Sequence, residues 1–508
     1  MAILLLFLIA RFNAVFHNLP AWQFCDEYMI TSHLWRLVLA KKIILEMFQY
    51  GGFNILPLLP IGFFVSEVEI IKFGKFFYLV VLGLGSVYLI YKISLLIVFK
   101  KNIAVLNSII FMLSPYVFSV GEYWYPDHYI YFFSAGFLYF ILKLYKEKNL
   151  KKLNFIFLGI ISAIIVSVKW TGLILMPILF FSLLFLFLNK KEDYAIFLKN
   201  TLYLITSFLV VILLLNYSIF FNFDKFLFDF TGNIKNYSAY EKSNFNPLYY
   251  LSVVYFLFAS ILSPIIIIFG YMKIFKTEKF IFFLLLTTVI FYSVILGLSG
   301  NLVLHRNVSI LIPFVIPLIG IGTFEFYNFF ANKNYFLVNF FSKIYISFFF
   351  IILLANFLYL FLNNLQEDSR VMALKWLRSN LDNGVTIGNN EVCSGPSPAH
   401  EAGFGHNHDP MFVYNYDYYV INSYWDSKID YLYHHRNPII TLPNQHYIHF
   451  NYFNENNIFK NALNKPNSYE DYKSVMDNYT VIKTFEGYGP KFYILMKKLN
   501  ANNNAKQK

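Results

Sequence analysis

The stretch Phe24-Cys25-Asp26-Glu27-Tyr28 places two adjacent carboxylates directly after the first apolar run of the chain, Met1–Leu19. Carboxylates are costly inside a bilayer, and membrane chains that keep them usually do so for a function. An acidic pair at the edge of an apolar run also fits a plain solvated loop. The placement of the other polar residues decides between these interpretations.

The composition is that of a membrane protein. Of the 508 residues, 58% are hydrophobic and only 14% are charged, against roughly 45–50% and about 25% in soluble globular chains. The net charge of +12 does not indicate nucleic-acid binding, because the basic residues lie in short loops between apolar runs, as membrane topology requires. The two cysteines, Cys25 and Cys393, have no metal-ligand spacing and form no disulfide framework. We therefore expect a polytopic α-helical membrane protein.

About eleven apolar runs have the length, roughly 17–25 residues, at which a helix crosses a bilayer. They are Met1–Leu19, Phe73–Val98, Ile103–Val120, Tyr129–Leu144, Phe155–Val168, the run that ends at Lys190-Lys191, Leu202–Phe220, Leu248–Met272, Phe280–Leu298, Val308–Phe329 and Tyr335–Leu362.

Basic loops assign the two sides of this membrane domain. Five such loops share one side if the N-terminus is inside, and cationic loops stay in the cytoplasm. They are Lys100-Lys101, Lys143–Lys152, Lys190-Lys191, Lys273–Lys279 and the loop of Lys333. The pair Asp26-Glu27 then faces the outside, as does a polar loop over Phe221–Pro247. We expect Thr31–Met47, also outside, to form an amphipathic helix on the membrane surface.

The chain changes character near Gln366, where Gly, Pro, Asn, Asp and His become common. The sequence predicts a transmembrane domain over 1–365 and a soluble α/β domain over 366–508, on the outer (periplasmic or lumenal) face. Its expected elements are a helix at Ser369–Asn380 and strands at Val385–Gly388, Tyr418–Ser423, Pro438–Leu442 and Lys491–Met496.

A second acidic centre opens the fourth apolar run. Glu122, Asp127 and His128 are the hypothetical ligands of a divalent cation, Mg or Mn, since such cations prefer oxygen ligands. Asp127 directly follows Pro126, and this order also suits a helix N-terminus with no metal.

Three cationic residues on the same face suit a phosphate. Lys169 lies where two apolar runs meet, and His305 and Arg306 precede another. Cationic donors bind phosphate through charge-assisted hydrogen bonds. The alternatives are an interfacial anchor for Lys169, beside Trp170, and a simple loop for the other two.

Histidine and acidic residues also gather in the Gly/Pro-rich loop over residues 400–409. His400, Glu401, His406, His408 and Asp409 are metal-ligand types, but they lack helical ligand spacing. A solvated loop is the simpler interpretation.

Several of these segments resemble one family. A short first helix followed by Phe24-x-Asp26-Glu27 resembles the protein O-mannosyltransferases and related lipid-linked-sugar transferases of the GT-C fold, the aminoarabinose transferases among them. The segment Ser167-Val168-Lys169-Trp170-Thr171-Gly172 is similar to their Ser-Val-Lys-Trp-Val-Gly, and Tyr125-Pro126-Asp127 to the acidic start of their fourth helix.

The resemblance extends over residues 1–330, with two departures. His305-Arg306-Asn307, followed by Pro313 and Pro317, is similar to a His-x-Arg-Tyr pattern in the bacterial relatives, but Asn307 stands where Tyr is usual. Phe53–Pro57 replaces the His-Pro-Pro segment of the eukaryotic enzymes.

The resemblance implies an integral-membrane glycosyltransferase that uses a polyprenyl-phosphate sugar. Asp26 takes the family's base position, with Glu27 assisting, and one displacement inverts the anomeric carbon. Lys169, His305 and Arg306 would bind the donor phosphate, and the acceptor is a hydroxyl of a glycan, lipid or protein. The alternative is a transporter or flippase of a lipid-linked or anionic substrate, although transporters usually place such residues near the bilayer midplane.

Overall fold

The structure is a computed structural model. It describes residues 2–16, 25–121, 124–147, 151–189, 194–238, 246–260, 262–299, 305–331, 336–366, 369–380, 387–389, 418–422, 479–485 and 492–497. The described residues divide into two compact units. The first unit holds Met1–Val15 and Ile30–Leu360, and the second holds the described residues among 16–29 and after Leu360.

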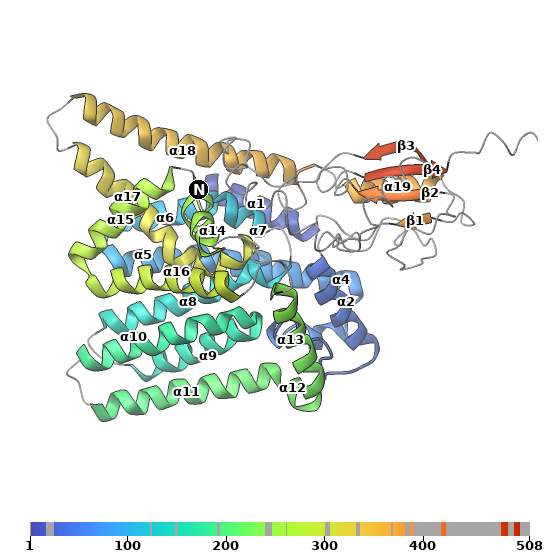
Figure 1. The fold of residues 1–508 in the computed structure, drawn as a ribbon, viewed down its shortest axis with the longest axis horizontal. Helices are drawn as coiled ribbons and strands as arrows, with labels where there is room; N and C mark the ends of the chain where they lie inside the picture. The colour runs from blue at the N-terminus through green and yellow to red at the C-terminus, as the bar shows by residue number, and fades with distance from the viewer. Residues whose placement is uncertain are drawn as a thin grey trace, which may run out of the picture. The chain divides into compact units, whose positions relative to one another are not determined.

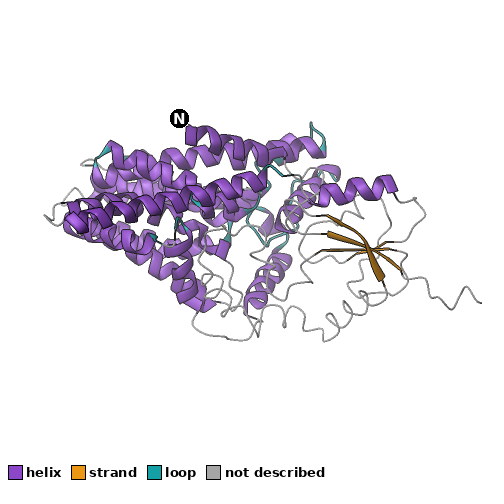
Figure 2. Ribbon diagram, turned by 90° about the horizontal axis from the view of Figure 1, so that it is seen from above, coloured by secondary structure: helices purple, strands orange, loops and turns teal. Residues whose placement is uncertain are grey.

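The regular secondary structure described in the first unit is helical (Figures 1 and 2). Its α-helices are α1 (Ala2–Phe16), α2 (Cys25–Leu39, which begins in the second unit), α3 (Leu59–Gly62), α4 (Glu67–Lys75), α5 (Leu82–Val98), α6 (Lys101–Leu113), α7 (Pro115–Val120), α8 (Pro126–Lys146), α9 (Lys152–Val168), α10 (Met176–Asn189), α11 (Tyr194–Asn216), α12 (Ser218–Phe221), α13 (Phe223–Ser238), α14 (Asn246–Ser252), α15 (Ser263–Thr277), α16 (Lys279–Ser299), α17 (Ile312–Ala331) and α18 (Phe336–Asn364). Short 3-10 or π segments are η1 (Gly52–Asn54), η2 (Phe76–Val81), η3 (Trp170–Leu175), η4 (Val253–Leu257) and η5 (His305–Leu311).

The long helices form a bundle in which α17 packs on α5, α6, α8, α15 and α16. Helices α8, α9, α10 and α11 run side by side (Figure 1), and α5 packs on α6 and α8. Every residue from Ile312 to Thr323 in α17 is buried, whereas only Phe197, Asn200, Leu204 and Asn216 are buried in α11. Helix α17 is therefore a core helix, and α11 lies at the rim with its apolar side chains facing outward.

Six of the described helical stretches are long and apolar enough to cross a membrane. They are Glu67–Val98, Trp170–Leu188, Tyr194–Asn216, Lys279–Leu298, Asn307–Ala331 and Asn339–Leu362. The chain is thus a multi-pass integral membrane protein, as expected, while the further crossings and the orientation of the domain stay predictions.

Two expectations for this unit are wrong. The helix predicted over Thr31–Met47 ends at Leu39, and Lys41 follows with a left-handed φ of 50°. The polar loop predicted over Phe221–Pro247 instead contains helix α13, because Phe223, Phe226 and Phe230 recur at helical spacing and share one face.

The second unit contains helix α19 (Ser369–Asn380) and a four-stranded sheet of order β1-β2-β4-β3. The strands are β1 (Ile387–Asn389), β2 (Tyr418–Asn422), β3 (Tyr479–Phe485) and β4 (Phe492–Lys497), and only the β1–β2 pair is parallel. Helix α19 has its predicted bounds, β3 was not predicted, and the strand expected at Pro438–Leu442 lies outside the described residues. The division at residue 366 and the outer location of this domain stay predictions.

Candidate active site

Lys169 lies at a sharp junction between two helices. It directly follows the last residue of α9, Val168, and precedes η3, with an extended backbone (φ −153°, ψ 131°). The turn is tight, because a Cβ at Gly172 would lie 2.8 Å from the carbonyl oxygen of Ile165. The side chain is only 7% exposed, so this geometry fixes a buried ammonium group at a helix end.

Asp127 pairs with this ammonium. Lys169 Nζ donates to Asp127 Oδ1 over 2.6 Å, and Asp127 is buried. Asp127 lies in the first turn of α8, directly after Pro126, where the exposed N–H groups of the helix favour a negative charge. The sequence thus brings two predicted site residues together as a charge-assisted pair.

Asn307 completes the group of buried polar side chains. Lys169 Nζ also donates to Asn307 Oδ1, over 2.8 Å. Because a lysine ammonium only donates, this contact fixes the orientation of the amide. Asn307 Nδ2 is buried and has no hydrogen-bond partner among the described residues. An amide donor therefore lies available beside Lys169.

Two asparagines hold the backbone that precedes Lys169. Asn54 Nδ2 donates to Gly51 O (2.7 Å) and to Val168 O (2.9 Å), and Asn54 Oδ1 accepts from the Tyr129 hydroxyl. Asn216 Nδ2 donates to Ser167 Oγ over 2.7 Å. These contacts connect η1, α8, α9 and α11 at the residues next to Lys169.

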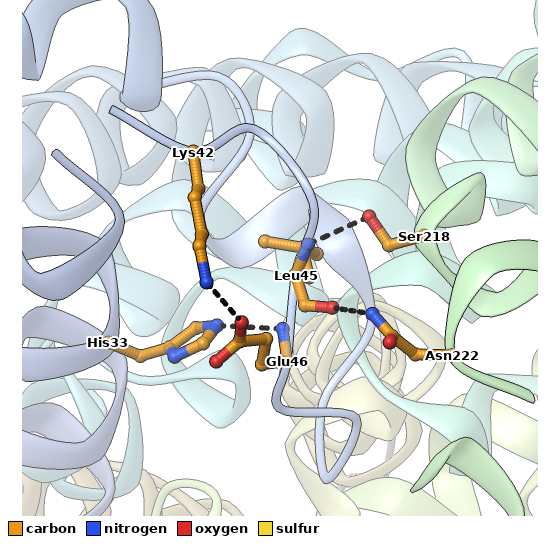
Figure 3. Close-up of polar contacts among 6 residues, drawn as sticks. All are labelled: His33, Lys42, Leu45, Glu46, Ser218 and Asn222. Atoms are coloured by element: carbon orange, nitrogen blue, oxygen red, sulfur yellow. Dashed lines mark hydrogen bonds and ion pairs between the residues drawn. The ribbon is translucent and has the colours of Figure 1, made fainter. Parts of the chain in front are cut away.

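Residues 43–50, which we name the strap, run beside this junction in irregular conformation. Leu45 N donates to Ser218 Oγ (2.9 Å), and Asn222 Nδ2 donates to Leu45 O (3.0 Å), as Figure 3 shows. Glu46 N donates to His33 Nε2 over 3.3 Å. At the far end, Trp170 Nε1 donates to the carbonyl oxygen of Phe48. The side chains of four residues therefore hold the strap through hydrogen bonds to its backbone: Ser218, Asn222, His33 and Trp170.

The predicted metal ligands have protein partners where they are described. His128 Nε2 lies 3.1 Å from Tyr78 O, and its Nδ1 lies 3.4 Å from the Tyr131 hydroxyl. Asp127 Oδ1 accepts from Lys169. No group of three His, Cys, Asp or Glu within the described ranges is arranged to hold a metal ion. Asp127 and His128 alone do not fit a cation, so we assign no step to one, and the cation stays a prediction that depends on Glu122, outside the described residues.

The remaining predicted residues are described only in part. The backbone of Asp26 lies in α2, and Glu27 in the same helix is buried. Both belong to the second unit, whereas Asp127 and Lys169 belong to the first. His305 and Arg306 lie in η5, immediately before Asn307. The side chains of Asp26, His305 and Arg306, and the whole of loop 400–409, lie outside the described residues.

Asn54, Asn216 and Asn307 are the residues whose roles the sequence did not reveal. Each is a buried polar residue in or beside an apolar run. Polar residues inside a bilayer are a general signal of a site or of a helix contact, but the sequence does not say which distant groups they meet.

A comparison with protein families relates the segment that contains Asp127 and Lys169 to known proteins. Residues 61–238 match the family of dolichyl-phosphate-mannose-protein mannosyltransferases. The match includes both Asp127 and Lys169. The resemblance expected from the sequence is confirmed over this family segment, which is about a third of the chain.

A comparison with solved structures supports a shared fold with one of them. The chain is similar to ArnT from Cupriavidus metallidurans bound to undecaprenyl phosphate, with a TM-score of 0.54 and 10% identity over 79% of this chain and 84% of that one. The apo state of ArnT gives a TM-score of 0.49 at 12% identity, with the same coverage. AglB from Archaeoglobus fulgidus gives 0.42 at 12% identity, over 76% of this chain and 58% of that one. No curated protein matches the chain. The likeness to ArnT supports the expected GT-C fold for the part of the chain that the match covers.

Proposed function

We propose that this chain is an integral-membrane glycosyltransferase that transfers a sugar from a polyprenyl-phosphate donor to an acceptor hydroxyl on the outer face of the membrane. The observation that carries the proposal is the buried contact between Asp127 and Lys169, both within the family segment. Two further facts support it: the fold is that of ArnT, and the ArnT structure holds undecaprenyl phosphate.

The donor phosphate binds at Lys169 and Asn307. Asp127 neutralises the charge of Lys169, so this pair contributes a directed N–H donor and no net charge. Asn307 Nδ2 adds a second buried donor. The net positive charge that a departing phosphate needs comes from Arg306, with His305 beside it in sequence, on the same short helix as Asn307. Such preorganised donors stabilise the charge that develops on the leaving group.

Asp26 acts as the general base, assisted by Glu27. It takes the proton of the acceptor hydroxyl while the acceptor oxygen forms its bond to the anomeric carbon. The bond from that carbon to the phosphate oxygen breaks, and the polyprenyl phosphate leaves with the bonding pair. Attack opposite the leaving group inverts the anomeric carbon. The acceptor is a glycan, a lipid or a protein.

The test is transfer of labelled sugar from a defined polyprenyl-phosphate sugar by the purified full-length protein. We expect Asp26→Asn to lower the turnover by a hundredfold or more with the donor still bound. The matched control is Asp224→Asn, an exposed aspartate on α13, which should retain wild-type turnover.

One outcome would contradict the transferase, and another would contradict only the role of Asp26. Donor binding without any transfer, combined with movement of labelled lipid-linked substrate across vesicles, would favour the transporter. Full activity of Asp26→Asn would leave the transferase standing and remove Asp26 as its base.

A further inference from the structure

Exposed phenylalanines gather where α11 ends and α12 and α13 follow. Phe220, Phe221 and Phe228 are 70%, 67% and 76% exposed, and we name them the phenylalanine patch. Burial of one such side chain contributes roughly 1.5–3 kcal/mol, so three exposed ones close together in sequence are unfavourable in water. A patch of this kind indicates a partner surface.

The position of the patch identifies that surface. Helix α11 is apolar enough to span the membrane, and few of its side chains are buried, so it faces lipid. Helix α12 begins two residues after α11 ends. Helix α13 runs at a steep angle to α11 (Figure 1). Helix α13 follows a lipid-facing span, runs at an angle to it and exposes apolar side chains. Such a helix suits the membrane–water interface at that end of the span.

The inner face of α13 is already occupied. The Phe226 and Phe230 rings lie 5.6 and 6.1 Å from that of Trp170. Asp229 Oδ2 accepts from Phe48 N of the strap, over 2.9 Å. Rotation of α13 to bury the patch would break these contacts. The patch therefore needs a partner outside the helical unit.

We propose that α12 and α13 form a membrane-interface anchor, with the phenylalanine patch inserted at the boundary between headgroups and acyl chains. The occupant is the bilayer that surrounds α11, because the patch continues the lipid-facing surface of that helix. This inference does not depend on the proposed activity.

The anchor contacts Trp170, the residue that follows Lys169. Its outer face lies in the interface, and its inner face holds both Trp170 and the strap. Ser218 and Asn222, in and directly after α12, bind the strap at Leu45. The bilayer boundary thus fixes the elements that pack beside the candidate active site.

Spin labels in the full-length protein, reconstituted in phosphatidylcholine vesicles, test the anchor. The background is Cys25→Ser with Cys393→Ser, and single cysteines are placed at Phe228 or Phe221. The controls are Leu209→Cys, on the exposed side of α11, and Lys42→Cys, at an exposed position directly before the strap. Collision with oxygen reports lipid, and collision with a water-soluble nickel chelate reports water.

We expect labels at Phe228 and Phe221 to have oxygen-to-nickel accessibility ratios between those of Leu209 and Lys42, at least several-fold above that of Lys42. Nickel accessibility equal to that of Lys42 at both positions would overturn the proposal. Exclusion of both reagents would also overturn it, since protein would then cover the patch. All labelled side chains are exposed, so the substitutions should not disturb folding. Elution of each variant as a single species verifies this.

Discussion

Lys169 Nζ lies 2.6 Å from Asp127 Oδ1, and both side chains are buried although 42 residues separate them in sequence. Two charges in such a place are stable only as a pair, because each one alone would lose its hydration without compensation. The pair therefore holds the start of α8 against the end of α9, and it directs the lysine toward Asn307.

The first prediction concerns this pair. Removal of one partner, as in Asp127→Leu or Lys169→Met, leaves an uncompensated buried charge and should cost about 3–5 kcal/mol. The double variant should recover most of that loss and still fail to transfer sugar. The measurement is the thermal unfolding midpoint in detergent.

The control for the pair is Glu46→Gln, which breaks the exposed Lys42–Glu46 pair and should cost about 0–1 kcal/mol. A double variant no more stable than the single ones would show that the two charges do not stabilise each other.

The second prediction concerns Asn307. In Asn307→Asp, one carboxylate oxygen still accepts from Lys169, but the other replaces the amide donor and repels an anion. We expect the affinity for undecaprenyl phosphate to fall at least tenfold at neutral pH, because the unmatched carboxylate must be desolvated beside the phosphate. Binding should recover in part near pH 5, where the added carboxyl group begins to take up a proton.

Asn102→Asp, at an exposed position, is the matched control and should bind like the wild type. Unchanged affinity in Asn307→Asp would remove Asn307 from the donor site and leave Lys169 to be tested separately.

The third prediction concerns close approach of the backbone at Gly51. A Cβ at this position would lie 2.2 Å from the carbonyl oxygen of Ser167, and backbone cannot yield as a flexible side chain does. Gly51→Ala should therefore lower the unfolding midpoint by several degrees and reduce the binding of donor, since Ser167 lies two residues before Lys169.

Gly232 provides the opposite control. It lies in helix α13, and a Cβ there meets no atom within 4 Å. Gly232→Ala should leave stability unchanged or raise it by about 0.5–1 kcal/mol, the helix preference of Ala over Gly. Equal effects of the two substitutions would contradict the close-packing argument.

Local signals predicted local structure in this chain. The periodicity of Val371, Leu374 and Leu377 gave helix α19 its correct bounds, and the Lys169–Gly172 turn appears where the sequence placed it. Helix α13 was missed although Phe223, Phe226 and Phe230 carry its period, because Asn, Asp and Lys around them read as a loop.

The contacts within the candidate site were not predictable in the same way. Asp127 and Lys169 were both identified, one as a metal ligand and one as a phosphate ligand, but no local pattern shows that they pair with each other. Asn54 meets Val168 across 114 residues, and Lys169 meets Asn307 across 138. Such partners meet because the ends of different helices pack together. A single sequence does not specify that packing.

The last prediction concerns His33, which accepts from the backbone N–H of Glu46 in the strap. Burial, and then the nearby Arg36, lower the pKa of His33 from 6.5 to about 4; Lys225 acts in the same direction and Glu46 opposes it. In the unfolded chain the imidazole takes up a proton near pH 6.5, whereas in the folded protein it stays neutral. Its contribution to stability is therefore complete above about pH 6.5 and is lost as the pH falls toward 4, by an amount on the order of 3 kcal/mol.

The measurement is the unfolding midpoint between pH 7.5 and 4.5, for the wild type and for His33→Gln. Glutamine retains an acceptor for the Glu46 N–H but does not titrate. We expect the wild type to lose stability faster than the variant as the pH falls through 6, with the two curves converging above pH 7. Parallel curves over the whole range would mean that His33 takes up its proton in the folded protein as readily as in the unfolded chain, and that its hydrogen bond to the strap contributes nothing that depends on pH.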